Sequence, residues 1–276
     1  MLTEGAVLHS KYKVERKIGE GGMSTVWLAR EISTSQIWAV KDINKKSKEF
    51  VAVANENGTL SEVEIVKDLN HPFIPHVNNV YEDSDSIQIV MEYVEGKTLK
   101  DILVKRGPIP EHLAVQIMKE LIEVFIYLHT RPDPVIFRDL KPGNIMIQVD
   151  GHIRLIDFGI ALLKRQNSKV LPLGTKGYAA PEQFKGKADA RSDIYTMGAT
   201  LYSLLTGIFP TTRDASFDDL LEKSPNTSTQ LAKIVLKATQ KDPDKRYHNV
   251  SELLKDLVTY NHHSFKKSFS IKIRRK

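Results

Sequence analysis

Glycines between two strand-like segments are the first pattern in the sequence that could do chemistry. Residues Ile18 to Val26 read Ile-Gly-Glu-Gly-Gly-Met-Ser-Thr-Val. Glycines let a backbone approach phosphate oxygens closely and offer N–H donors that side chains would obstruct. A dinucleotide-binding fingerprint would need a helix after the glycines, and a Walker loop would need Gly-Lys-Ser or Gly-Lys-Thr. A strand follows instead, so the segment predicts either a phosphate-binding hairpin or an ordinary β-turn.

A lysine ends the next apolar strand, which reads Trp-Ala-Val-Lys up to Lys41. A lysine in this position can point its ammonium group into a cleft, where burial requires a negatively charged partner. The alternative is an exposed lysine on an edge strand. Taken alone, the residue favours the exposed edge-strand lysine.

Three further motifs follow in the second half of the chain. Residues 135–146 contain Arg-Asp-Leu-Lys-Pro-Gly-Asn, residues 153–159 end in Asp-Phe-Gly, and residues 180–182 are Ala-Pro-Glu. With the glycine-rich loop and Lys41, they complete the ordered signature of protein kinases. The chain resembles the protein kinases, specifically the Hanks-type serine/threonine kinases common in bacteria, over about residues 10–260.

The resemblance implies an α+β fold with two lobes and an ATP-dependent activity. We expect a small β-rich N-lobe with one helix (helix C) at residues 1–94, a larger mainly helical C-lobe at 95–262, and a basic tail at 263–276. The implied reaction moves the γ-phosphoryl group of ATP to serine or threonine hydroxyls of proteins, the kinase itself included. The implied cofactors are ATP and Mg²⁺, with Mn²⁺ as a substitute.

The resemblance also assigns residues to the nucleotide. Lys41 would hold the α- and β-phosphates and pair with Glu62, which lies ten residues before Pro72, where the family has its helix-C glutamate. Met91 would be the gatekeeper residue. The residues expected around ATP are Ile18, Gly19, Glu20, Gly21, Gly22, Met23, Ser24, Thr25, Val26, Ala39, Lys41, Glu62, Met91, Glu92, Val94 and Met146.

Four residues of the second half would carry the chemistry, as the resemblance implies. Asp139 would accept the hydrogen bond and then the proton of the substrate hydroxyl, and Lys141 would steady the γ-phosphate. Asn144 and Asp157 would hold Mg²⁺ through oxygen atoms, which hard cations prefer. Lysine at position 141 is typical of serine/threonine kinases rather than tyrosine kinases.

Regulation is expected at the segment between Gly159 and Ala180. Kinases with an arginine before the catalytic aspartate, here Arg138, often need a phosphate on this segment. Thr175 is expected to bond near Asp139 and Lys141 in a structural role. Ser168, with basic neighbours, is therefore the candidate phosphosite, and a loop that becomes ordered unaided is the alternative.

Two departures from the family pattern and two architectural contacts complete the comparison. Ser24 replaces the third glycine of the loop, and Phe137 replaces the histidine before Arg-Asp, without loss of a catalytic group. We expect a buried ion pair between Glu182 and Arg246. We also expect Asp193 to hold the backbone of the catalytic loop.

The elements that must position these residues follow from local patterns. Alternating or β-branched runs predict strands in the first lobe, and apolar spacing predicts a helix over 60–69 that ends before Pro72. Wide apolar stripes predict helices in the second lobe. The expected strands are 12–18, 25–29, 36–40 and 87–91, and the expected helices after residue 97 are 111–130, 194–205, 231–239 and 250–260.

Composition narrows the remaining classes of function. The chain has no cysteine, which excludes disulfides and thiolate metal sites. It shows no apolar run near the roughly 18 residues of a membrane span and no signal-peptide pattern. We therefore expect a cytoplasmic protein, with the cytoplasmic face of a membrane as a second location. The oligomeric state is left open.

The net charge of +6 comes from the end of the chain. Residues 265–276 contain six basic residues and no acidic one, and the other 34 basic residues are balanced by 34 acidic residues. This distribution argues against a nucleic-acid partner, whose binding face is usually basic across a folded surface. Four apolar residues alternate with the bases, which suggests an anionic membrane surface. A pairing strand or a solvated tail are the alternatives.

Two other functions share parts of the pattern. A pseudokinase scaffold predicts loss of at least one of Lys41, Asp139, Asn144 and Asp157, and all four are present. A small-molecule phosphotransferase generally lacks the Ala-Pro-Glu element found here. Protein substrates with serine or threonine acceptors are therefore the expected partners.

Overall fold

The computed structural model describes residues 2–53, 61–158, 162–163, 172–212 and 216–260. The candidate phosphosite Ser168 and the predicted tail both lie outside these residues.

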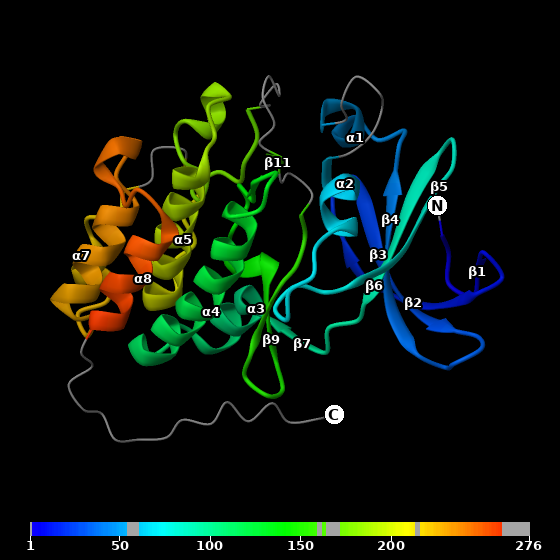
Figure 1. Cartoon of the computed structure of the whole chain (residues 1–276). Helices are drawn as coiled ribbons and strands as arrows, with labels where there is room; N and C mark the ends of the chain where they lie inside the picture. The colour runs from blue at the N-terminus through cyan, green and yellow to red at the C-terminus, as the bar shows by residue number, and fades with distance from the viewer. Residues whose placement is uncertain (1, 54–60, 159–161, 164–171, 213–215, 261–276) are drawn as a thin grey trace. The chain divides into compact units, whose positions relative to one another are not determined.

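The chain divides into two compact units, residues 1–95 and 96–276. The first unit is built on an antiparallel sheet with the strand order β1-β2-β3-β4-β6-β5 (Figure 1). Its strands are β1 (Val7–Leu8), β2 (Tyr12–Glu20), β3 (Ser24–Glu31), β4 (Ile37–Asn44), β5 (Val77–Glu82) and β6 (Ser86–Glu92).

The centre of this sheet is buried because its strands are apolar or β-branched. In β4, every residue from Trp38 to Ile43 is buried, as expected for a strand covered on both faces. Tyr12, at the start of β2, is also fully buried, and its hydroxyl accepts bonds from the amides of Asn78 and Asn79 at 2.9 and 2.8 Å. These bonds link β2 to the edge of the sheet formed by β5.

The helical part of the first unit differs from the expectation of one helix. The described residues contain two short helices, α1 (Lys48–Val53) and α2 (Ser61–Lys67), on either side of residues 54–60. The second is the expected helix, and it ends two residues earlier than predicted. It ends before Asn70-His71-Pro72, because a residue that precedes proline is disfavoured in helical conformation.

The second unit is mainly helical, with short strands near its start. Its strands form one sheet of order β10-β9-β7 and a separate pair, β11 with β8. They are β7 (Gly96–Thr98), β8 (Val135–Ile136), β9 (Ile145–Gln148), β10 (Ile153–Leu155) and β11 (Leu162–Leu163). The helices are α3 (Leu99–Arg106), α4 (Glu111–His129), α5 (Ala190–Thr206), α6 (Leu220–Lys223), α7 (Thr229–Ala238) and α8 (Val250–Thr259).

Helix α5 is the centre of this unit, and every residue from Ser192 to Thr206 is buried. Its start is fixed by a capping box between Asp189 and Ser192, and its end by Gly207 in a left-handed conformation. The predicted helix over 194–205 is confirmed, and it begins four residues earlier than predicted.

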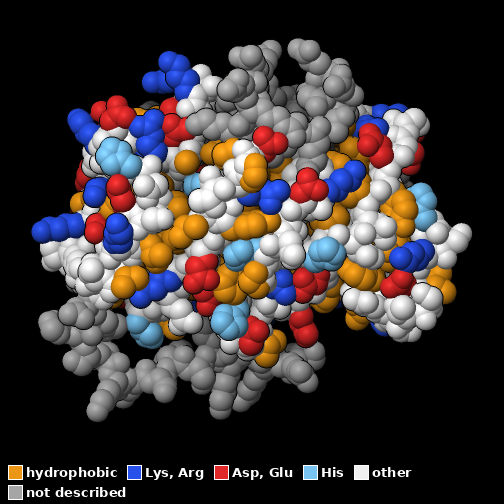
Figure 2. All heavy atoms as spheres, viewed as in Figure 1, with side chains coloured by type: hydrophobic (Ala, Val, Ile, Leu, Met, Phe, Trp, Pro, Cys, Tyr) orange, Lys and Arg blue, Asp and Glu red, His pale blue; other side chains and the backbone are white. Residues whose placement is uncertain are grey.

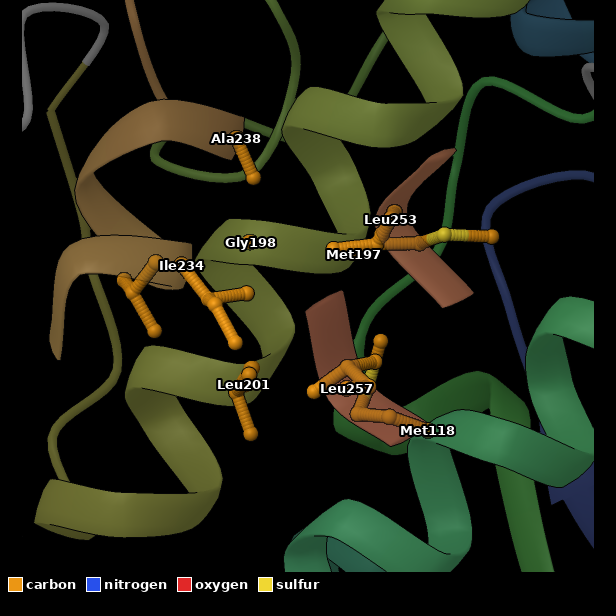
Figure 3. Close-up of a pocket in the computed structure, with 9 residues that line it drawn as sticks. Met118, Met197, Gly198, Leu201, Ile234, Ala238, Leu253 and Leu257 are labelled. Carbon is orange, nitrogen blue, oxygen red and sulfur yellow. The ribbon is translucent and has the colours of Figure 1, made fainter. Parts of the chain in front are cut away.

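Helices α4, α7 and α8 pack around α5. Their apolar side chains meet in a narrow seam (Figure 3), lined from all four helices. Gly198 allows α5 and α7 to approach closely, because a Cβ atom there would lie 2.8 Å from the Cβ of Ala238. Packing at this density leaves little freedom to move α5 relative to its neighbours.

Charges of both signs lie on the surface of the described residues. On the face shown in Figure 2, basic and acidic side chains are interspersed, in agreement with the balanced charge of residues before the tail. Across the described ranges, no helix combines the length and the apolar character needed to cross a bilayer.

Candidate active site

The glycine-rich segment forms a tight hairpin between β2 and β3. The Gly21 N–H donates to the Ser24 carbonyl at 2.8 Å, and Glu20 pairs with Thr25 across the hairpin. A Cβ atom added at Gly21 would meet no atom closer than 3.8 Å. Glycine is therefore not required by packing within the hairpin, which leaves space beside the backbone at the tip.

Lys41 lies in the middle of the sheet and is only 6% exposed. Its strand neighbours are Val26 in β3 and Ile89 in β6. The edge-strand alternative for this lysine is therefore wrong, because β4 is paired on both sides. Glu62 lies in α2, and its side chain is outside the described part of the structure, so its pairing with Lys41 stays a prediction.

The expected adenine-binding residues come from β4, from the end of β6 and the residues after it, and from β9. Ala39 in β4 pairs with Met91, and Val94 is buried. The Glu92 N–H donates to the His76 carbonyl at 2.9 Å, which fixes the backbone where the strand ends. Met146 lies in β9 of the second unit. All these positions stay predictions as nucleotide contacts.

Asp139 is the centre of a compact polar cluster in the second unit. Its Oδ1 accepts a hydrogen bond from the Thr175 hydroxyl at 2.5 Å, and its Oδ2 lies 2.7 Å from Lys141 Nζ. Lys141 also donates to Thr175 at 2.8 Å, which closes the triangle. The expected contacts of Thr175 with both residues are therefore confirmed. The side-chain amide of Asn144 also donates to the Asp139 carboxylate. Three donors in all therefore hold this carboxylate in one orientation.

Asn144 and Asp157 are the residues that could hold Mg²⁺. The Ile156 N–H donates to the Asn144 carbonyl at 2.9 Å. This bond brings the backbone next to Asp157 beside Asn144. The Asn144 amide nitrogen donates to the Asp139 carbonyl at 2.9 Å, which leaves its amide oxygen as the atom that could coordinate a cation. Asp157 is exposed and has a φ of 66°, a conformation that aspartate adopts more readily than most residues.

An amide oxygen and a carboxylate fit a hard cation such as Mg²⁺, which usually keeps several ligands from water and substrate phosphates. In the part of the chain that the structure describes, no three His, Asp or Glu side chains cluster as a complete protein site for a metal would require. The donor set therefore fits Mg²⁺ bound together with a nucleotide.

The backbone before Asp139 is fixed from below by Asp193, a fully buried residue in the first turn of α5. Its carboxylate accepts the N–H groups of Phe137 at 3.0 Å and Arg138 at 2.7 Å. The predicted anchoring role of Asp193 is confirmed by these bonds. His129 adds a third contact, with Nε2 2.8 Å from Oδ2 of Asp193. Sequence reasoning missed His129, whose only signal is a polar residue at the end of an apolar helix.

Arg138 is buried and has a φ of 66°. Burial lowers the pKa of its guanidinium group to about 10, while the negative charges of Asp193 and Asp139 act in the opposite direction. The side chain therefore still carries its positive charge at neutral pH.

Phe137 fills its position by aromatic packing. Its ring meets that of Phe158 edge-on at 5.0 Å between centroids, and that of Phe125 at 5.8 Å. Edge-to-face pairs at these distances are stabilising. The expectation that an aromatic residue can replace the usual histidine agrees with this packing.

The Ala-Pro-Glu motif ends in the expected ion pair. Glu182 accepts two bonds from the guanidinium group of Arg246, at 2.6 and 2.9 Å, and both residues are buried. Burial raises the pKa of Glu182, but its bonds to Arg246 and Ser192 outweigh this effect and the net pKa is lowered.

A model of the protein kinase domain matches residues 12–265. The chain belongs to the protein kinase family. Its kinase domain has the expected α+β fold, with a β-rich first unit and a mainly helical second unit.

Several curated relatives of the kinase domain come from bacteria. It is 33% identical to a probable serine/threonine-protein kinase of Clostridium perfringens. The matched region covers 92% of this chain and 38% of that protein. It is 32% identical to the serine/threonine-protein kinase PrkC of Bacillus subtilis, over 92% of this chain and 41% of PrkC. PknB of Mycobacterium leprae is 34% identical over 93% of this chain and 44% of PknB. The chain thus spans about two fifths of the length of these relatives.

The hairpin of the kinase domain offers a clean test of nucleotide binding. Gly21→Ala adds a methyl group where the structure has space, so we expect an unchanged melting temperature. If the backbone tip lies against phosphate, the methyl group should lower ATP affinity by about tenfold, the equivalent of about 1.4 kcal/mol. Calorimetric titration with ATP and Mg²⁺, beside thermal unfolding, checks both values. Unchanged affinity would remove the hairpin from the nucleotide site.

Proposed function

We propose that this kinase domain transfers the γ-phosphoryl group of ATP to serine and threonine hydroxyls of protein substrates. The observation that carries the proposal is the cluster in which Thr175, Lys141 and Asn144 hold the carboxylate of Asp139. Phosphoryl transfer needs alignment of the reacting groups and neutralisation of charge more than covalent help from the protein. The names of the relatives support the choice of serine and threonine.

In the proposed mechanism, Asp139 accepts a hydrogen bond from the substrate hydroxyl and takes its proton as the oxygen attacks the γ-phosphorus. The bond between the γ-phosphorus and the β,γ-bridging oxygen breaks, and ADP leaves. We propose that the Lys141 ammonium group, which lies 2.7 Å from the same carboxylate, contacts an oxygen of the phosphoryl group as it moves. Thr175 keeps the other carboxylate oxygen in place. General-base assistance of this kind typically contributes about 10²–10⁴-fold to the rate.

The residues proposed to hold the nucleotide are those that the family resemblance assigns to it. We propose that Lys41, paired with Glu62, binds the α- and β-phosphates, and that the backbone of Glu92 and Val94 binds the adenine edge. Asn144 and Asp157 would hold Mg²⁺, which neutralises phosphate charge when it is bound. Lys41 is buried in β4, and a buried ammonium group needs negative charge around it. In this proposal the phosphates contribute part of that charge.

Activation by a phosphate on Ser168 stays a proposal. A phosphate carries about −1.5 to −2 charges at neutral pH and can order a loop by charge-assisted hydrogen bonds. The buried guanidinium group of Arg138, next to Asp139, is the cation that such a phosphate would address.

The proposed function is tested by incubating purified protein with ATP and Mg²⁺ and a protein acceptor, and mapping the phosphosites by mass spectrometry. We expect phosphoserine and phosphothreonine on the acceptor and on the kinase itself, with Ser168 among the sites if activation follows the proposal. Phosphate on neither protein would contradict the proposed function. Transfer to tyrosine alone would contradict the assigned specificity.

We further propose that the basic tail associates a cytoplasmic kinase with an anionic membrane surface. Each basic residue near such a surface contributes about 1 kcal/mol, and screening by salt reduces the sum. In liposome co-sedimentation we expect binding that requires anionic lipid, falls with added salt and disappears when residues 265–276 are deleted. Binding that survives the deletion would refute this role of the tail.

A further inference from the structure

Gln183, the residue after the Ala-Pro-Glu motif, is fully buried and uses its whole side-chain amide. Its Oε1 accepts the Ala180 N–H at 3.0 Å. Its Nε2 donates to the carbonyl oxygens of Arg138, at 3.0 Å, and Leu173, at 3.1 Å. A buried amide with these three bonds is satisfied, and loss of any of them leaves a backbone group unpaired.

The three partners belong to segments that meet at the reacting carboxylate. Arg138 directly precedes Asp139, and Leu173 lies two residues before Thr175, which bonds Asp139. The segment passes so close to Gln183 that a Cβ atom at Gly174 would lie 2.9 Å from Nε2. The amide thus ties the segment that carries Thr175 to the loop that carries Asp139.

The position of Gln183 is itself fixed by its neighbour in the chain. Glu182 is held by the buried guanidinium group of Arg246 and by the hydroxyl of Ser192 in α5, at 2.7 Å. The backbone that presents Gln183 is therefore attached to the core of the second unit. A side chain that positions other residues must itself start from a rigid backbone.

We propose that Gln183 is a positioning residue for the protein acceptor: it sets the segment 172–180 against Asp139, so that the acceptor hydroxyl reaches the carboxylate. This inference rests on the proposed function. All three side-chain bonds go to the catalytic loop and to this segment, and none to a residue assigned to ATP. Loss of the amide therefore affects use of the acceptor and leaves nucleotide binding intact.

Two substitutions of similar size separate the roles of the amide. Gln183→Met removes all three bonds, and Gln183→Glu keeps an acceptor for Ala180 but places a carboxylate against two carbonyl oxygens. Steady-state kinetics with a protein acceptor should show an acceptor KM raised by about tenfold or more, since a small misplacement can cost about 10²-fold. The KM for ATP, and the slow hydrolysis of ATP without acceptor, should stay within about twofold of wild type.

A matched control separates positioning from general stability. Tyr202→Phe removes one hydrogen bond of a tyrosine hydroxyl in the same unit, to Asp219 at 2.9 Å, and none of the bonds of Gln183. It should lower the melting temperature without a change in the acceptor KM. If Gln183→Met does not fold, Gln183→Asn, which keeps the amide on a shorter side chain, is expected to raise the acceptor KM by a smaller factor.

A double variant tests the route through Thr175. If Gln183 acts by placing Thr175, its substitution should add little to the acceptor KM of Thr175→Val. An unchanged acceptor KM in any folded Gln183 variant, or an equal rise in Tyr202→Phe, would overturn the inference alone. Absence of transfer by the wild-type protein would instead contradict the proposed function on which it rests.

Discussion

Asp139→Asn is expected to reduce phosphoryl transfer by about 10²–10⁴-fold, the usual effect of losing a general base. The substitution keeps the size of the side chain and an oxygen that can accept the bond from Thr175. Its amide nitrogen can no longer accept from Lys141 and Asn144, so thermal unfolding of the variant is measured beside its activity. The amide cannot take a proton from the substrate hydroxyl. ATP affinity should therefore change little, which separates this effect from loss of nucleotide binding.

Asp157→Asn is the matched control for this experiment. It removes a charge that we assign to Mg²⁺, so it should weaken metal-dependent nucleotide binding as well as transfer. Single-turnover transfer and nucleotide titration, measured on both variants, distinguish the two roles. Turnover of Asp139→Asn near that of wild type would show that the assigned mechanism is wrong.

Arg246→Met is expected to be among the most destabilising single substitutions in the second unit. It leaves the carboxylate of Glu182 buried without its cation, a change that costs about 3–5 kcal/mol of unfolding free energy. The backbone carbonyls of Arg191, Gln240 and Lys241 also lose the bonds that they accept from Arg246. Denaturant unfolding of the two proteins measures the difference. Adding Glu182→Gln to Arg246→Met removes the isolated charge. The double variant should therefore regain part of the unfolding free energy that Arg246→Met loses.

The same pair makes a prediction about pH. The pKa of Glu182 is lowered from its ordinary value of 4.5, so its ionised form stabilises the fold above that value. This contribution falls as the pH drops below 4.5 through the pKa of the folded state. In Arg246→Met, burial acts without the guanidinium group and raises that pKa, so the difference in stability between the two proteins should narrow in acid. A constant difference from pH 7 to pH 4 would show that the pair is not the cause.

The sequence predicted the long elements well, because their signals are local. The apolar stripe of 111–130 and the glycine at 207 define α4 and the end of α5 within a residue or two. Strand β5 was missed, since its asparagines and half-buried residues do not alternate clearly. The hairpin of β9 and β10 was missed because each strand is short.

The candidate site was predicted unevenly for a different reason. Contacts within the kinase motifs, such as those of Thr175 and Glu182, follow from the family resemblance. His129 and Gln183 bond to partners 64 and 45 residues away along the chain, and neither has a motif of its own. Only the packing of α4, α5 and the catalytic loop brings these atoms together, so no local pattern could have identified them.

The hydrogen bonds between the catalytic loop and α5 affect how activity is lost when the protein unfolds. Asp193 holds the backbone before Asp139, and the Thr200 hydroxyl donates to the carbonyl of Leu140 just after it. The loop is thus hydrogen-bonded on both sides of Asp139 to α5, the most buried helix of the second unit. Heat or mutation that unfolds this helix should therefore also displace Asp139, the proposed base. We expect thermal loss of phosphoryl transfer to follow the same transition as unfolding of the second unit.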